Sequence, residues 1–155
     1  MPHIHDKIDF TVEVFVVHDD RVLLRRHDKY KIWLSVGGHI ELDEDPNQAA
    51  IREVREEVGL EVKLKRIGLS FPKENIDYNE LIPPVFLNRH RINETHEHVT
   101  LVYFASSKTD VLKQSKEEKS DELKWFTREE LEKNSYGIRE SIRYYALRAL
   151  NNFKK

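Results

Sequence analysis

The chain has 155 residues, of which 26 are lysine or arginine and 28 are aspartate or glutamate, so its formal net charge is −2. This balance gives no global basic field, and we therefore expect no nucleic-acid partner. The absence of cysteine excludes disulfides and thiolate metal sites. The chain starts without an apolar signal segment and holds no apolar run of bilayer length. We expect one domain over residues 1–155, in the cytoplasm and without a membrane partner.

Strands and helices are predicted to follow one another without a linker. Residues 10–17 (FTVEVFVV) are β-branched and partly alternating, and VLLRRH returns after a polar turn as a hairpin partner. The segments HVTLVYFAS and ELKWF indicate two further strands. A short helix should begin after Thr127, an N-cap with Glu130 at N3, and SIRYYALRALNNF has helical apolar spacing. The class is therefore α/β, with a mixed sheet between helices.

The segment ELDEDPNQAAIREVREEVGL predicts a helix with an unusual charge pattern. Asp45 is a good N-cap, Gln48 completes a capping box, and Gly59 suits a C-terminal stop. Three glutamates are spaced by three and four residues and therefore share one narrow face, where they repel one another. These are Glu53, Glu56 and Glu57.

Two interpretations of this acidic face are available. A solvated, charge-rich helix is ordinary in a chain with 35% charged residues. Alternatively, a hard divalent cation such as Mg²⁺ is bound by clustered carboxylates, with backbone carbonyl and water completing the shell. The second interpretation is favoured by Gly37-Gly38, which follows a strand and permits close backbone approach, and by Glu44, a fourth acid just before the N-cap.

This region resembles the Nudix box, G-x5-E-x7-R-E-U-x-E-E-x-G-U, where U is apolar. Every fixed position is present at the expected spacing: Gly38, Glu44, Arg52, Glu53, Val54, Glu56, Glu57, Gly59 and Leu60. A chance match at one starting point has a probability on the order of one in a billion. The strand hairpin before the box and the KWF strand and helix after it also resemble the family. Val36 and Asp43 replace residues that are frequent in the family, but neither position is fixed.

The resemblance implies a Nudix α/β/α sandwich that hydrolyses a nucleoside diphosphate derivative, such as a nucleotide sugar, ADP-ribose, a dinucleoside polyphosphate or a (d)NTP. It also implies a Mg²⁺ or Mn²⁺ cofactor, which would neutralise the diphosphate and lower the pKa of a bound water. The family's metal ligands fall here on Glu56 and Glu57, with the carbonyl of Gly37 or Gly38 contributing.

Three further box residues take roles from the resemblance. Glu53 would be another metal ligand or the base for the attacking water, Arg52 would orient the carboxylates, and Glu44 would brace the loop and the helix start. The alternative is a Nudix domain that only binds a nucleotide, for regulation or as a scaffold. The intact carboxylate set favours the enzyme. A homodimer stays open, because many relatives are dimers.

Several family members draw an extra carboxylate from a loop outside the box. Glu117 and Glu118, in the polar loop before the last predicted strand, are our candidates for this role, and Glu97 is the rival. A mobile loop can close over a substrate, whereas Glu97 comes from a strand start and is held more rigidly. For each of the three, a solvated loop charge is the alternative.

The segment RHRINETHEH contains three histidines, which raises the question of a zinc site: His90, His96 and His98. The chain has no cysteine and this segment has no helical H-x3-H pair. We therefore interpret these histidines as substrate contacts or as polar residues at a strand edge.

The residues that would bind the rest of the substrate are less clearly marked. Arg25 and Arg26 leave the second predicted strand near the expected mouth of the site and could hold phosphate, with exposed strand-end charges as the alternative. Tyr78 lies about where dinucleoside-polyphosphate hydrolases of the family carry a tyrosine. Four other aromatic residues are alternative stacking partners for a base, or else pack in the core or rim: Tyr30, Trp33, Phe71 and Phe86.

Overall fold

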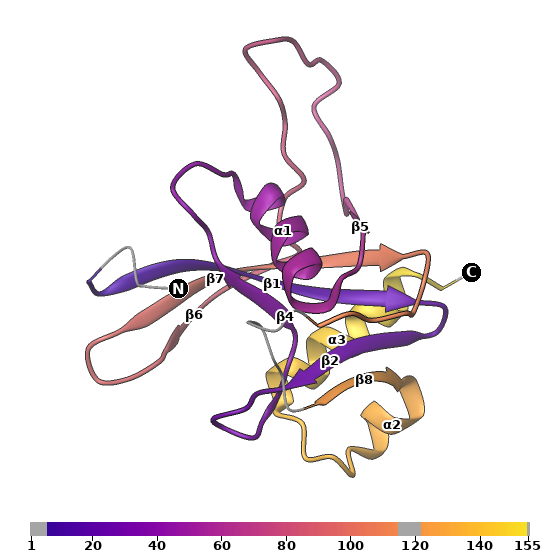
Figure 1. Ribbon diagram of the computed structural model, residues 1–155. Coiled ribbons are helices and arrows are strands. Elements are labelled where there is room, and N and C mark those ends of the chain that lie inside the picture. The colour runs from indigo at the N-terminus through magenta and orange to yellow at the C-terminus, as the bar shows by residue number, and fades with distance from the viewer. Residues whose placement is uncertain (1–5, 115–121, 155) are drawn as a thin grey trace.

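The computed structural model describes residues 6–114 and 122–154, which form a mixed sheet with helices on both sides (Figure 1). Two long strands lie parallel at its centre, β1 (Ile8–His18) and β7 (Glu97–Ser107). Their register places Ile8 opposite Glu97 and Val17 opposite Ser106. This parallel pair brings together two segments that lie about ninety residues apart in the sequence, and its register positions the residues of the site described below.

On the edge that faces away from its parallel partner, each central strand pairs with two shorter antiparallel strands. β1 pairs with β4 along its first half and with β2 at its end, while β7 pairs with β6 and with β5. β3 and β8 both pair with β2. The bounds of these shorter strands are β2 Arg21–Arg26, β3 Trp33–Leu34, β4 Val36–His39, β5 Val62–Leu64, β6 Phe86–Arg91 and β8 Glu122–Thr127. The predicted hairpin and the predicted late strands are confirmed.

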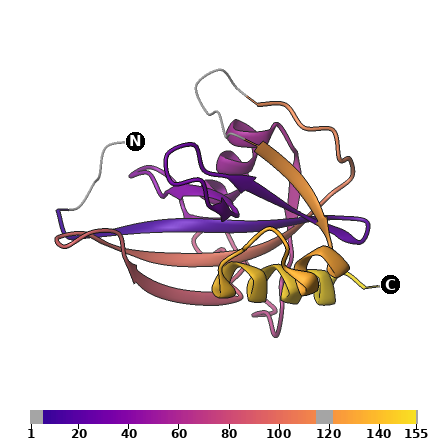
Figure 2. The same cartoon turned by 90° about the horizontal axis from the view of Figure 1, so that it is seen from below.

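Both faces of β1 are buried, because its side chains alternate between two apolar cores. Val14 and Val16 belong to the core under α1 (Pro46–Val58). Phe15 and Val17 belong to the core under α2 (Arg128–Lys133) and α3 (Glu140–Asn152). A strand that is covered on both faces reads as a nearly continuous apolar run, as residues 10–17 do. Figure 2 shows α1 on one side of the sheet and α2 and α3 on the other, so the predicted α/β/α layers are confirmed.

The helix that carries the acidic face begins and ends where its sequence predicts. The Asp45 side chain accepts a 2.9 Å hydrogen bond from the backbone N–H of Gln48, and the Gln48 side chain accepts one of 2.9 Å from the Asp45 N–H. Gly59 ends the helix in the left-handed region at φ 71°. Ala50 and Val54 anchor it in the core, and Glu53 beside them lies against Gly38 of β4.

A long connection, residues 65–85, leaves β5 and returns to β6, and it projects beyond α1 in Figure 1. Its apolar side chains Leu69 and Ile76 are almost fully exposed. None of the helices in residues 6–114 and 122–154 is long and apolar enough to cross a membrane.

Candidate active site

The guanidinium of Arg52 joins the glutamates of α1 to the loop before it. It donates to both carboxylate oxygens of Glu44, at 2.6 and 2.9 Å, and its Nη1 donates to Glu53 at 2.9 Å and to Glu56 at 3.1 Å. Nη2 also donates to the backbone carbonyl of His39 at 3.0 Å. Charge-assisted, forked bonds of this kind fix geometry as well as adding energy. The Glu44 carboxylate raises the pKa of Arg52, and the Arg52 guanidinium in turn lowers the pKa of Glu44.

Two of the three helix glutamates are turned inward. Glu53 and Glu57 are each only 6% exposed, whereas the Glu56 side chain is 48% exposed. The Glu57 carboxylate lies 3.1 Å from Nε of Arg25 on β2. The Glu53 carboxylate lies directly over the β4 backbone, because a Cβ added to Gly38 would stand 2.4 Å from its Oε1. Gly38 therefore provides the space that the buried carboxylate occupies.

The charges of this cluster fit a divalent cation. Five glutamates oppose two arginines, so that with all seven groups ionised the formal charge is −3: Glu41, Glu44, Glu53, Glu56 and Glu57 against Arg25 and Arg52. Buried carboxylates are costly without enough positive charge beside them. Hard dications take clustered carboxylate and carbonyl oxygens, which are the donors present here.

A cavity of about 540 Å³ begins at Gly37 and Gly38 and extends over the sheet face that carries α3. This volume lies within the range of small-molecule sites in proteins. The wall combines polar residues of the two central strands with apolar and aromatic residues of the surrounding loops. Its members include Thr11, Glu13, Thr100, Tyr30, Ile32 and Ile92.

Glu13 is an acid of the cavity wall that the sequence analysis missed. The Ser35 hydroxyl donates a 3.1 Å hydrogen bond to its Oε1. Burial raises the pKa of the Glu13 carboxyl, against the opposing effects of Ser35 and Arg25. A signal was present in the sequence, since Glu13 is the one charged residue within the apolar run FTVEVFVV. A lone acid on a strand that is buried on both faces points to a functional position.

The comparison with known proteins places this arrangement in a family. Residues 8–146 match the NUDIX domain family. The chain belongs to the Nudix family. A hydrolase of the NUDIX family from Clostridium perfringens has a solved structure that is 35% identical, with a TM-score of 0.82 over 94% of this chain and 98% of that one. The family and the fold expected from the sequence are both confirmed.

Two curated relatives of this Nudix chain carry names that state a reaction. A dihydroneopterin triphosphate diphosphatase from Haemophilus influenzae is 38% identical over 86 residues, or 55% of this chain and 53% of that protein. A CTP pyrophosphohydrolase from Escherichia coli K12 is 31% identical over 100 residues, or 59% of this chain and 72% of that protein. The chain thus spans about half the length of the first relative. The expectation of an enzyme that hydrolyses phosphoanhydride bonds is confirmed at the level of the family.

The predicted substrate residues of this Nudix domain have separate locations. Arg25 lines the cavity, but Arg26, the next residue of β2, is not among the described residues that line it. Tyr78 lies in the 65–85 connection, is 52% exposed and packs its ring 5.4 Å from that of Phe71, away from the described cavity wall.

The aromatic residues predicted as alternative stacking partners lie in different parts of the fold. Trp33 is buried in the core under α3, and Phe86 packs against the same core. Tyr30 is 58% exposed and forms part of the cavity wall, which makes it the aromatic residue best placed to meet a bound heterocycle.

Three acids outside the box were predicted as candidates to assist catalysis. Glu117 and Glu118 lie outside the described residues, so their assignment stays a prediction. Glu97 begins β7 and is held by Arg89, whose Nε and Nη2 donate to its two oxygens at 2.7 and 3.0 Å. The Arg89 guanidinium lowers the pKa of Glu97. An acid held in this way is poorly suited to accept a proton.

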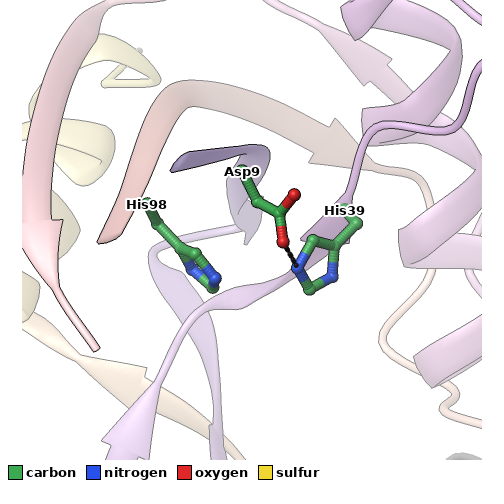
Figure 3. Close-up of side chains that lie close together, drawn as sticks. All are labelled: Asp9, His39 and His98. Atoms are coloured by element: carbon green, nitrogen blue, oxygen red, sulfur yellow. Dashed lines mark ion pairs between the residues drawn. The ribbon is translucent and has the colours of Figure 1, made fainter. Parts of the chain in front are cut away.

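The three histidines of RHRINETHEH meet Asp9 and His39 at the end of the cavity, a grouping that the sequence analysis missed. Asp9 is 1% exposed, and its Oδ2 lies 3.2 Å from Nε2 of both His39 and His96. Figure 3 shows the rings of His39 and His98 on either side of the Asp9 carboxylate. Burial, with the neighbouring imidazole of His39 next in effect, lowers the pKa of His98 to about 4.

Proposed function

We propose that this Nudix domain is a Mg²⁺- or Mn²⁺-dependent pyrophosphohydrolase that cleaves a diphosphate linkage in a nucleoside diphosphate derivative by attack of water on phosphorus. The observation that carries the proposal is the set of glutamates fixed by Arg52 beside Gly38, at one end of a cavity of substrate size. Neither the charge cluster nor the cavity alone would specify this reaction. Together they provide a metal site on one side of the Gly37-Gly38 backbone and a place for an organic group on the other side.

Glu56 and Glu57, with Glu53 and the carbonyl of Gly37 or Gly38, are the groups that would hold the metal. When bound, a divalent metal neutralises the diphosphate, lowers the pKa of a coordinated water and aligns it for in-line attack. The arginines of the chain hold these carboxylates in place before a substrate arrives. Such preorganisation is a large part of catalysis, because the site does not have to reorganise during the reaction.

Glu53 is proposed either as a further metal ligand or as the acceptor of a proton from the attacking water. Its carboxylate is confined between the Arg52 guanidinium and the β4 backbone, so its position is well determined. Glu117 and Glu118 are the rival acceptors. A single domain over residues 1–155 and the cytoplasmic location expected from the sequence are retained as parts of the proposal.

The cavity is proposed to bind the organic part of the substrate. Tyr30 offers an aromatic surface, and Glu13 with Ser35 offers polar groups at the floor. The two named relatives act on dihydroneopterin triphosphate and on CTP, which both join a flat heterocycle to a triphosphate. Triphosphates of flat heterocycles are therefore the first substrates to test.

A hydrolysis screen tests the proposal. Purified protein with Mg²⁺ or Mn²⁺ is offered CTP, other (d)NTPs, dihydroneopterin triphosphate, nucleotide sugars, ADP-ribose and dinucleoside polyphosphates, and the released phosphate or pyrophosphate is measured. We expect turnover of at least one triphosphate and loss of that turnover in Glu56→Gln. Tight nucleotide binding without turnover of any compound would instead identify a binding or regulatory domain.

A further inference from the structure

Four neighbouring strands place histidine and aspartate side chains in a row across one face of the sheet. In the ladders, Asp9 of β1 lies opposite His98 of β7, and His98 lies opposite His90 of β6. On the other side of β1, His39 of β4 lies opposite Thr11, which is two residues from Asp9 and therefore on the same face. The strand registers, rather than a local motif, bring these side chains together.

The members of the row that come closest together are Asp9, His39 and His98. Their ligand atoms all lie within 4.8 Å of one another, and Nε2 of His39 is 3.2 Å from Oδ2 of Asp9 (Figure 3). Two ligand atoms on a tetrahedral zinc ion stand about 3.4 Å apart, given bonds of about 2.1 Å. The Asp9–His39 pair already has that spacing. The other separations exceed it by at most about 1.4 Å, which side-chain rotation can close.

We propose that Asp9, His39 and His98 bind a divalent transition-metal ion of the Zn²⁺ class, at a site distinct from the acidic face of α1. Two imidazole nitrogens and one carboxylate oxygen suit Zn²⁺ and its neighbours, whereas Mg²⁺ takes oxygen ligands. Three protein ligands leave a fourth position for water or for an oxygen of a bound molecule. His39 and His98 line the cavity, so this position is directed toward it.

The surroundings of the three side chains are those of a metal site. His96 is 5% exposed and its Nε2 lies 3.2 Å from Asp9 Oδ2, so it can hold the carboxylate in its ligating orientation. Asp9 is almost completely buried, where a dication adds favourable charge.

The proposed site is joined to the acidic face through His39. The imidazole of His39 belongs to the metal site, while its backbone carbonyl accepts the hydrogen bond from Arg52. The preceding residue, Gly38, lies against the Glu53 carboxylate. A metal that fixes His39 therefore also fixes the backbone segment from which the acidic face is built.

Zinc binding by the full chain tests the proposal. Zn²⁺ itself is the probe, titrated by calorimetry in excess Mg²⁺, which competes for the oxygen-rich acidic face. We expect one tightly bound Zn²⁺ per chain and a loss of affinity of about 100-fold or more in each of Asp9→Asn, His39→Asn and His98→Asn. His96→Asn should lose about 10- to 100-fold, the usual effect of removing a partner of a ligand. His18→Asn, at the opposite end of β1, is the matched histidine control and should bind zinc as the wild type does.

Several results would overturn the proposal. Wild-type protein that binds no Zn²⁺ would do so, as would wild-type affinity in both His39→Asn and His98→Asn. Loss of zinc in Glu56→Gln would place the ion on α1 instead, and loss in a His3→Asn/His5→Asn variant would place it at the N-terminus. Circular dichroism checks that each variant is folded. Because the readout is zinc binding, the result is independent of whether the proposed hydrolysis occurs.

Discussion

Replacement of Gly38 by alanine should separate the chemistry of Glu53 from the stability of the fold. The added Cβ would stand 2.4 Å from Oε1 of Glu53, so the carboxylate must retreat by about 0.6 to 1.0 Å to reach 3.0 to 3.4 Å. The end of a glutamate side chain can make this movement. A misplacement of about 1 Å can cost about 100-fold in rate, and we expect a loss of that order in kcat.

The neighbouring glycine provides the matched control. A Cβ on Gly37 would stand 2.0 Å from the backbone carbonyl oxygen of Val12, which has no freedom to withdraw. Overpacking against backbone should cost about 3 kcal/mol, which lowers the Tm of a domain of this size by about 6 to 12 °C. Gly38→Ala weakens only the bond between Arg52 and Glu53, so its cost should stay near about 1.5 kcal/mol, or about 3 to 6 °C.

The assay is kcat on the best screened substrate, with thermal melting and Mg²⁺ affinity measured on the same preparations. Reduced Mg²⁺ affinity in Gly38→Ala would assign Glu53 as a ligand, and unchanged affinity with low kcat would assign it as the base. Wild-type kcat in folded Gly38→Ala would show that the position of the Glu53 carboxylate does not govern the rate. A Tm loss as large as that of Gly37→Ala would show that the backbone, rather than the carboxylate, accounts for the effect.

Three further predictions concern acids and the arginine that joins them. Arg52→Gln should lower stability by about 3 to 5 kcal/mol in urea melts, and Arg52→Lys should recover part of that stability but little kcat, because an ammonium cannot make the forked bonds. Glu117→Gln or Glu118→Gln should lower kcat more than Glu97→Gln at saturating metal, with metal affinity little changed; a large loss at Glu97 alone would reverse the assignment. Burial raises the pKa of Glu13 above 4.5, so its contribution to stability is fully present below that pH and is lost as pH rises through the folded-state pKa. Glu13→Gln should therefore gain stability relative to wild type as pH rises above 4.5, and parallel curves of Tm against pH would contradict this.

The parts of the structure that were predictable are those coded by short-range signals. The capping box of Asp45 and Gln48 and the left-handed stop at Gly59 define α1 within its own sequence, and the structure confirms all three. The acidic face follows directly, because side chains three and four residues apart on a helix must be neighbours. The box is local in the same sense, so its pattern identified the family without knowledge of any strand pairing.

The features that sequence reasoning missed depend on pairing between distant strands. Asp9 and His98 are brought together by the parallel register of β1 and β7, and His39 joins them only through the β1–β4 ladder. No spacing rule connects residues that lie 30 and 59 positions apart. For Tyr78, in contrast, the sequence position resembled that of a tyrosine in the family, but the position alone does not determine how the long 65–85 connection folds. In the structure Tyr78 pairs with Asn75 and packs against Phe71 within that connection.

Metal held by the glutamates of α1 is required for hydrolysis in the proposed function, and the metal dependence of the wild type and of two variants of α1 tests this requirement. Protein stripped with EDTA is assayed on the best screened substrate while Mg²⁺ or Mn²⁺ is titrated back, alongside Glu56→Gln and Glu57→Gln. We predict no turnover without metal and saturable recovery in the wild type. Both variants should stay folded and lose activity by orders of magnitude, because a lost ligand removes several kcal/mol of charge stabilisation. Full turnover in EDTA, or a wild-type rate in either variant, would show that the glutamates of α1 do not hold a catalytic metal.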